Sequence, residues 1–276
     1  GFVNTNYDNV IYAFPFTSSC NWVGLGVIGY GKAWINGTYT LRTVRHELGH
    51  NYGLYHSSSY TCTNASRTRV FWSDACTQSE YGDPFDIMGS ATQAHTNNFQ
   101  KGRLHWYTPQ NTLTVTADGT YVLSPIEQAS GGTLALRIPR TIETNTNNIT
   151  QYMYLEFRQP LGFDNSFSSQ APVVNGVSIR VAPDYPNLFK PRLLDATPTT
   201  SGFLDAPLLA GNSIVDPRTG TVINVISVSP NGAIVNLDVA MPTPCIRQKP
   251  SLSITPSSQS GLAGQTLNYT ISITNN

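Results

Sequence analysis

HELGHNYGLYH occupies residues 46–56, and the spacing of its histidines carries most of the information in this chain. On an α-helix, residues four apart differ by about 40° around the axis and about 6 Å along it. His46 and His50 would therefore project from one face and could bind a single ion. Gly53 permits a turn with positive φ, which would bring His56 back as a third nitrogen ligand.

Three histidine ligands leave the fourth position of a tetrahedral zinc ion open, which is the arrangement of a catalytic site rather than a structural one. Glu47 would lie about 100° round the helix from His46, near the ion but poorly placed to bind it. It is then free to take a proton from a zinc-bound water. The sequence predicts zinc as the cofactor, His46, His50 and His56 as the metal ligands, and Glu47 as the catalytic residue. Histidines that merely line a helix would not explain why three of the five in the chain fall within this stretch.

The composition excludes several classes of protein. The 276 residues have a formal net charge of zero, and only 12% of them are charged. No basic patch or charge run suggests nucleic acid as a partner, and no apolar run reaches the roughly 18 residues needed for a membrane span. Low charge and an even number of cysteines favour a secreted, extracellular protein. The oligomeric state stays open.

The four cysteines, Cys20, Cys62, Cys76 and Cys245, match no zinc-binding spacing and allow three pairings. Cys62 and Cys76 enclose a short polar loop, and we expect them to form a disulfide. Cys20 would then pair with Cys245. Free buried thiols are the alternative.

The first part of the chain predicts a mixture of strands and helices. Residues 9–16 are typical of a buried strand, and 22–35 contain four glycines, which mark close backbone approach or a sheet edge. Thr40 is the expected N-cap of a helix over about 41–52. Residues 90–106 predict a second helix below the site.

From residue 112 apolar residues recur at every second position instead of at the helical spacing of 3.6 residues, which predicts strands. Asp118-Gly119 and Asn231-Gly232 are expected to be two-residue hairpin turns. Glu156 and Arg158 alternate with apolar neighbours, which favours a solvated strand face. The expected strands cover residues 112–116, 120–125, 133–138, 152–158, 176–182, 221–229 and 233–240.

EYGDPFDIMG at residues 80–89 makes a family resemblance specific. The extended histidine motif is that of the metzincin metallopeptidases. Met88 resembles the methionine turn that lies below the metzincin zinc site. DPFDIMG after an HExxHNxGxxH helix, with CNWVGLG at 20–26 and AWING at 33–37, is similar to the gametolysin-like branch, peptidase family M11. No tyrosine directly follows Met88, so the oxyanion donor found at that place in some branches is missing.

The resemblance implies an α+β fold with two main domains. Residues 1–110 would form a metzincin-like zinc catalytic domain, and 111–241 an antiparallel β-sandwich domain. Only 45 residues precede His46, fewer than metzincins usually have, so we expect this catalytic domain to be truncated at its N terminus. Residues 242–250 are expected to be a linker, and 251–276 the start of a truncated immunoglobulin-like module.

The resemblance also implies a secreted zinc endopeptidase that acts on protein or peptide substrates. A substrate would lie as an added strand along residues 24–31. One alternative is a non-catalytic surface-binding or adhesion protein that retains the site, although such a protein has no need of Glu47. A second alternative is a gluzincin in which Glu80 is the third ligand.

Overall fold

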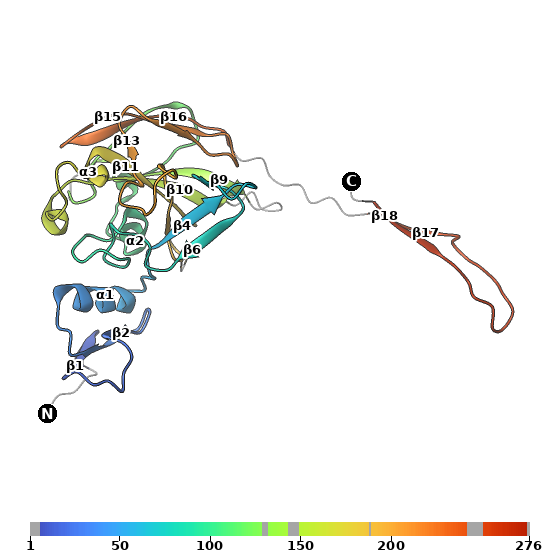
Figure 1. The fold of residues 1–276 in the computed structure, drawn as a ribbon, viewed down its shortest axis with the longest axis horizontal. Helices are drawn as coiled ribbons and strands as arrows, with labels where there is room; N and C mark the ends of the chain where they lie inside the picture. The colour runs from blue at the N-terminus through green and yellow to red at the C-terminus, as the bar shows by residue number, and fades with distance from the viewer. Residues whose placement is uncertain (1–5, 129–131, 143–148, 188, 242–250, 275–276) are drawn as a thin grey trace.

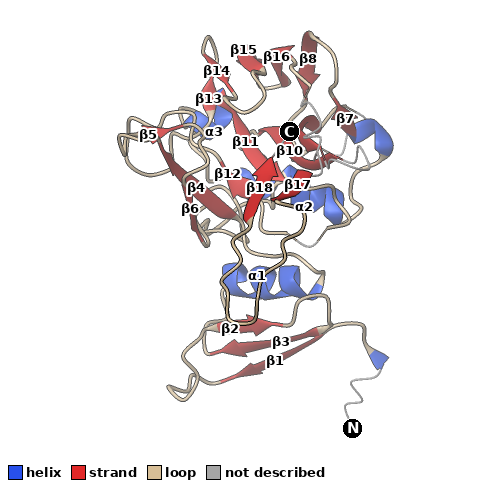
Figure 2. Ribbon diagram, turned by 90° about the vertical axis from the view of Figure 1, so that its right-hand side faces the viewer, coloured by secondary structure: helices blue, strands red, loops and turns tan. Residues whose placement is uncertain are grey.

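The computed structural model describes residues 6–128, 132–142, 149–187, 189–241 and 251–274, and shows an α+β fold dominated by sheets (Figure 1). A small sheet lies below helix α1 (Leu41–Asn51), and a much larger β-rich body lies above it (Figure 2). The α+β class expected from the sequence is confirmed. The metzincin and β-sandwich arrangements, and the proposed domain bounds, stay predictions.

The small sheet contains β1 (Val10–Phe14), β2 (Gly24–Gly26) and β3 (Lys32–Asn36) in the order β1-β3-β2. β1 is parallel to β3, and β2 is antiparallel to it. One edge of β2 therefore faces away from the sheet. The predicted helix α1 begins after Thr40, whose hydroxyl accepts a hydrogen bond from the N–H of Thr43 at 3.2 Å.

The glycines of β2 show the close approach expected of them. A Cβ on Gly24 would lie 2.4 Å from Oε1 of Glu47, and a Cβ on Gly26 would lie 2.4 Å from the Glu47 carbonyl oxygen. Both glycines therefore face α1. A side chain at either position would collide with the helix, which fills the space beside these two glycines.

Two larger sheets form the body. The nine-stranded sheet has the order β5-β4-β12-β11-β10-β9-β7, with β13 paired to β11 and β6 paired to β4. Its strands are β4 (Ser58–Thr63), β5 (Arg69–Val70), β6 (Cys76–Ser79), β7 (Thr112–Thr114), β9 (Ala135–Ile142), β10 (Ile149–Phe157), β11 (Gly176–Ala182), β12 (Arg192–Leu193) and β13 (Leu208–Leu209). The four-stranded sheet, ordered β14-β15-β16-β8, consists of β14 (Ser213–Val215), β15 (Val222–Ser229), β16 (Gly232–Asp238) and β8 (Gly119–Leu123). The largest apolar core cluster contains buried residues of both sheets. The nine-stranded sheet contains strands from before and after residue 110, the boundary that the sequence predicts between the two main domains.

The short helices connect these strands. They are α2 (Asn98–Arg103), α3 (Pro172–Asn175) and the 3-10 turns η2 (Pro109–Asn111) and η3 (Gly162–Asp164). The second helix is shorter than the expected span of 90–106. Asn97 caps its start by accepting a hydrogen bond from the Gln100 N–H at 3.0 Å.

The two expected hairpins had different outcomes. The prediction of a hairpin at Asp118-Gly119 is wrong, because β7 pairs with β9 in one sheet and β8 pairs with β16 in the other. β15 and β16 do form an antiparallel hairpin. Its two turn residues are Pro230 and Asn231, because Ser229 already pairs with Gly232.

The prediction of a solvated face at Glu156 and Arg158 is wrong, because both side chains are fully buried. Arg158 Nε lies 2.7 Å from Glu156 Oε1, and Arg180 Nη1 donates to the same oxygen at 2.8 Å. Arg180 Nε also donates to Asp83 Oδ2 at 2.6 Å. One face of β10 packs in the core between the large sheets, and its other face is covered by α2 and by the loop containing Asp83. Alternation of polar and apolar residues along a strand does not reveal that its polar face is also covered by other parts of the chain.

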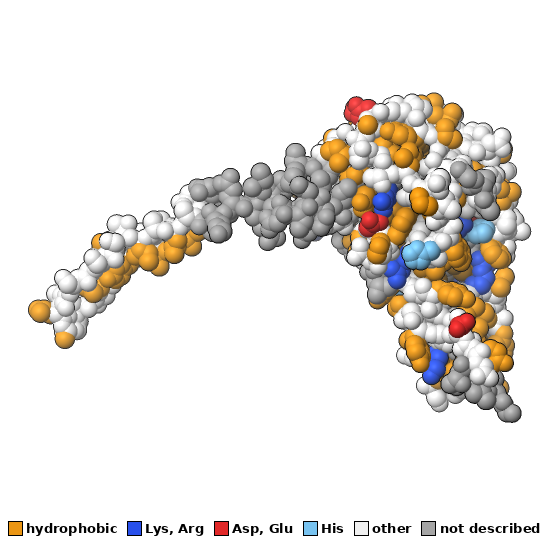
Figure 3. Space-filling view, turned by 180° about the vertical axis from the view of Figure 1, so that it is seen from behind, with side chains coloured by type: hydrophobic (Ala, Val, Ile, Leu, Met, Phe, Trp, Pro, Cys, Tyr) orange, Lys and Arg blue, Asp and Glu red, His pale blue; other side chains and the backbone are white. Residues whose placement is uncertain are grey.

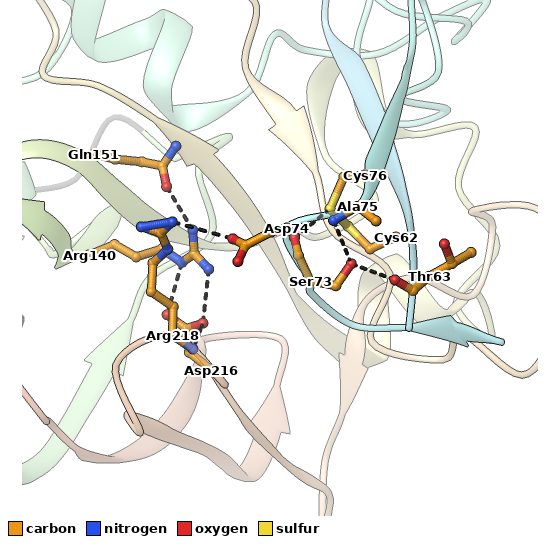
Figure 4. The surroundings of a disulfide bond; sticks show 10 residues. All are labelled: Cys62, Thr63, Ser73, Asp74, Ala75, Cys76, Arg140, Gln151, Asp216 and Arg218. Carbon is orange, nitrogen blue, oxygen red and sulfur yellow. Dashed lines mark hydrogen bonds and ion pairs between the residues drawn. A yellow bond between two sulfur atoms is a disulfide. The ribbon is translucent and has the colours of Figure 1, made fainter. Parts of the chain in front are cut away.

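The expected Cys62–Cys76 disulfide is present and joins β4 to β6. Figure 4 shows nearby polar contacts between this region and the four-stranded sheet, including the buried ion pair of Arg140 with Asp216. Cys245 lies outside the described residues, as does the expected linker, so the Cys20–Cys245 pairing stays a prediction.

The C-terminal hairpin pairs β17 (Ser251–Thr255) with β18 (Thr270–Thr274). Both strands are exposed along their whole length, and apolar side chains follow one side of the hairpin (Figure 3). Among the described residues, no helix has the length and apolar character needed to cross a membrane.

Candidate metal centre

The three histidines predicted as ligands lie together in the structure. His46 and His50 project from α1, and the chain turns at Gly53, where φ is +88°, to return His56 toward them. One ring nitrogen from each histidine lies within 4.8 Å of the others. Nε2 of His50 and Nε2 of His56 are 3.1 Å apart. This group could hold one metal ion.

The other ring nitrogen of each histidine has an oxygen partner, which leaves Nε2 available as a ligand. An Nδ1–H that donates to a carbonyl or carboxylate fixes the ring orientation and places the free lone pair on Nε2. The Nδ1 pairs are His46 with Ile87 O at 2.9 Å, His50 with Leu54 O at 2.8 Å, and His56 with Glu80 Oε1 at 2.7 Å. Two of the three partners are backbone carbonyls.

Burial keeps these rings in their neutral form. It lowers the pKa of His46 to about 4, and it also lowers the pKa values of His50 and His56. For His56 the hydrogen bond to Glu80 opposes this effect. Neutral imidazole is the form that binds a metal ion, so the protein need not remove protons from the rings near pH 7.

Glu80 lies on the Nδ1 side of His56, opposite the Nε2 atom that faces the other histidines. Its carboxylate also accepts a hydrogen bond from Lys190 Nζ at 2.6 Å, and this bond, together with that from His56, lowers the pKa of Glu80. This geometry does not favour the gluzincin alternative, because Glu80 is already hydrogen-bonded to His56 and Lys190.

Met88 packs against α1. Its side chain is fully buried, and a Cβ on Gly49 would lie only 2.4 Å from its Sδ. Asp86 Oδ1 accepts a hydrogen bond from the Met88 N–H at 2.7 Å and so fixes the turn. The carbonyl of Ile87 in this turn is the partner of His46.

Glu47 is also buried, and it lies on the side of α1 that faces β2. Burial raises its pKa to about 7, although a backbone hydrogen bond from Gly26 and the charge of Arg42 lower it. A carboxylate with a pKa near the working pH is well suited to accept and then return a proton.

A cleft of about 720 Å³ opens beside these groups. Tyr81 forms part of its wall, and its ring centroid is 3.8 Å from that of His56. Tyr81 adopts φ of +60°, an uncommon conformation for a residue other than glycine. The cleft is lined by Phe16, Ser18, Cys20, Asn21, Trp22, Val23, Gly24, Arg42, Thr43, His46, Glu47 and Tyr81.

The model of one protein family, described as gametolysin peptidase M11, matches residues 2–170, which is more than half of the chain. The chain belongs to the gametolysin M11 family. Membership of this peptidase family implies a metallopeptidase with protein substrates, and the three histidines could hold its metal. A search of curated proteins and a search of solved structures found no match.

Sequence reasoning missed several groups that shape this gametolysin-family site. Backbone carbonyls, such as that of Ile87, have no sequence signal as hydrogen-bond partners. Glu80 was considered only as an alternative ligand, and its contact with Lys190 joins residues far apart in the chain. Arg42 could have been found, because it precedes His46 by four residues and therefore lies on the same face of α1.

Proposed function

We propose that this protein is a secreted zinc-dependent endopeptidase with His46, His50 and His56 as zinc ligands and Glu47 as the general base. The observation that carries the proposal is the convergence of three Nε2 atoms whose rings are each fixed through Nδ1. Three neutral nitrogen donors and an open side suit a catalytic zinc ion.

In this mechanism, a bound zinc ion would polarise the scissile carbonyl and lower the pKa of water. Glu47 takes the proton of the attacking water and passes it to the leaving amine. The hydrogen bond from the Gly26 backbone holds the Glu47 carboxylate in place. The oxygen partners of the Nδ1 atoms keep the three rings from rotating.

An extended peptide substrate would bind along the free edge of β2. Within the described residues, β2 pairs only with β3, so its other edge offers backbone N–H and C=O groups. This edge runs beside Glu47 and opens into the cleft. A peptide that adds as an antiparallel strand would have its backbone fixed by hydrogen bonds while its side chains are selected by pockets.

Extracellular location is part of the proposal. The Cys62–Cys76 disulfide supports it, because disulfides persist mainly in oxidising environments.

A binding or adhesion protein that retains the metal site is the second candidate. The observation that favours it is the C-terminal hairpin, whose exposed apolar side chains include Leu252, Ile254, Ile271 and Ile273. Such a protein would not depend on Glu47.

The deciding experiment compares Glu47→Gln with His56→Ala in the full chain. Glu47→Gln should keep about one zinc per chain and the parent fold, while hydrolysis of unfolded protein substrates falls by roughly 10²–10⁴-fold. His56→Ala should lose metal and activity together. Asp238→Asn, a carboxylate-to-amide change at an exposed position of β16, is the matched control and should change neither.

Two results would refute the enzyme proposal. One is zinc-loaded parent protein that shows no chelator-sensitive hydrolysis. The other is a Glu47→Gln protein that is as active as its parent.

A further inference from the structure

The cleft beside the metal centre has mainly apolar and aromatic walls, but it also contains one basic side chain. Phe16, Trp22 and Val23 line one part of it, and Arg42 lines another. Glu47, the proposed general base, is its one acidic lining residue. A guanidinium group in such surroundings is a recognition group for an anion.

Among the described residues, Arg42 makes a single hydrogen bond, and its charge also acts on Glu47. Its Nε donates a hydrogen bond to the carbonyl oxygen of Ala91 at 3.0 Å. Its two terminal nitrogens have no hydrogen-bond partner within the described part of the chain, although the side chain is half-buried. The guanidinium is therefore oriented but keeps donors that a ligand could use.

The direction of β2 indicates which part of a substrate would meet Arg42. A peptide antiparallel to β2 has its N-terminal half near Gly26 and its C-terminal half near Gly24 and Trp22. Gly24 lies against the Glu47 carboxylate, and the cleft continues from there toward Trp22. The cleft therefore lies on the leaving-group side of the scissile bond.

We propose that Arg42 selects substrates that carry a carboxylate on the residue directly C-terminal to the scissile bond. An arginine can hold a carboxylate through two parallel N–H···O bonds, which gives both affinity and geometric selectivity. The ligand is an Asp or Glu side chain of the substrate, with the aromatic walls packing against its methylene groups. This inference rests on the proposed peptidase function and specifies its substrate class.

The hydrolysis experiment uses peptides that differ only at the residue after the scissile bond: Asp, Glu, Asn, Leu or Lys. Each is made as a C-terminal amide and as a free acid. The parent protein should cleave the Asp and Glu peptides with a kcat/KM roughly ten- to a hundredfold above that of the Asn peptide, as expected for a hydrogen bond between charged groups. The preference should be equal in amides and free acids.

Three variants test whether Arg42 causes this preference. Arg42→Gln can still donate to the Ala91 carbonyl but should lose the preference. Arg42→Glu should reverse it in favour of Lys. Arg218→Glu makes the same change of charge at an exposed position distant from the cleft and should leave the preference unchanged. Zinc content of each protein confirms that the site has folded.

A binding measurement separates this inference from the peptidase function itself. Glu47→Gln protein loaded with zinc is titrated with the labelled Asp and Asn peptides. Tighter binding of the Asp peptide, abolished by adding Arg42→Gln, supports the role of Arg42 even if the parent hydrolyses nothing. Hydrolysis without any acidic preference would instead leave the peptidase function standing and overturn this inference.

Two further results would also overturn it. Equal affinity for the Asp and Asn peptides would show that no carboxylate is recognised. A preference limited to free-acid peptides would place a terminal carboxylate, rather than an acidic side chain, against Arg42.

Discussion

Nδ1 of His56 lies 2.7 Å from Oε1 of Glu80, and the same oxygen accepts a hydrogen bond from Lys190 Nζ. His46 and His50 are instead oriented by backbone carbonyls, which no substitution removes directly. His56 is therefore the proposed ligand whose orientation can be tested by changing one side chain.

Glu80→Ala should weaken zinc binding by roughly 10- to 100-fold, because the ring of His56 loses the acceptor that orients it. Lys190→Met, which removes only the second partner of Glu80, should have a smaller effect. Competition with a chromophoric chelator measures both affinities. Complete loss of zinc in Glu80→Ala, with zinc retained in His56→Ala, would show that Glu80 is itself the third ligand.

Gly49→Ala should destabilise the protein by about 1–3 kcal/mol, because the new methyl group would collide with Met88. Met88→Ala alone should cost about 2–5 kcal/mol through the cavity it leaves. In the double variant the methyl group added at position 49 occupies part of that cavity, so the loss should be smaller than the sum of the two. Urea unfolding of the four proteins measures the coupling, and strict additivity would show that the two residues do not pack together.

Gly24→Ala should reduce hydrolysis strongly while zinc content stays at the parent level. The added Cβ would lie within 2.7 Å of three Glu47 side-chain atoms and would displace the proposed base. Gly119→Ala is the matched control, since its Cβ would meet only ordinary contacts of 3.4 Å or more. Parent-like activity in Gly24→Ala would mean that Glu47 does not need its present position.

Stability should fall in acid through protonation of Glu156. Burial alone would raise its pKa, but Arg158 and Arg180 outweigh this effect and lower it from 4.5 to about 2. A carboxylate with a depressed pKa in the folded state contributes stability above its unfolded pKa and loses that contribution as the pH falls. About 3 kcal/mol should therefore be lost between about pH 4.5 and pH 2.

Urea unfolding at several pH values measures this loss. Glu156→Gln should be less stable near pH 7 but should show a flatter dependence on pH between 4.5 and 2. Asp238→Asn should show the same dependence of stability on pH as the parent protein. If the stability of Glu156→Gln depends on pH in the same way as that of the parent, the loss of stability in acid is due to other groups.

Replacing both Cys62 and Cys76 with serine should lower the free energy of unfolding by roughly 3 kcal/mol, because the unfolded chain then gains the entropy of an open loop. Thermal unfolding with and without a reducing agent measures the difference. Parent protein that is equally stable in reducing conditions would contradict this expectation.

The convergence of the three histidines could be predicted from sequence because the information for it is local. His46 and His50 are one helical turn apart, Thr40 caps the helix, and Gly53 provides the turn that returns His56. Each of these features depends on spacing within seventeen residues, over which helical geometry fixes the outcome.

The surroundings of the site could not be predicted because their partners are distant in sequence. Arg180 contacts Asp83, which is 97 residues away, and the pattern around Glu156 is the same for a solvated and a doubly covered strand. The pairing of β7 and β8 into different sheets likewise depends on tertiary packing, which overrides a local turn signal.

The buried contacts of Arg158 and Arg180 determine how small an active fragment of this protein can be. A protein cut after residue 110 would retain the complete histidine motif and the Met88 turn. It would lose Arg180, the partner of the Asp83 carboxylate, and Arg158, which donates to the Phe85 carbonyl at 2.7 Å. The turn that supports His46 would then detach from the sheet that holds it. A fragment expressed on its own should therefore extend through β11 and β12, and shorter fragments should fail to bind metal although every proposed ligand is present.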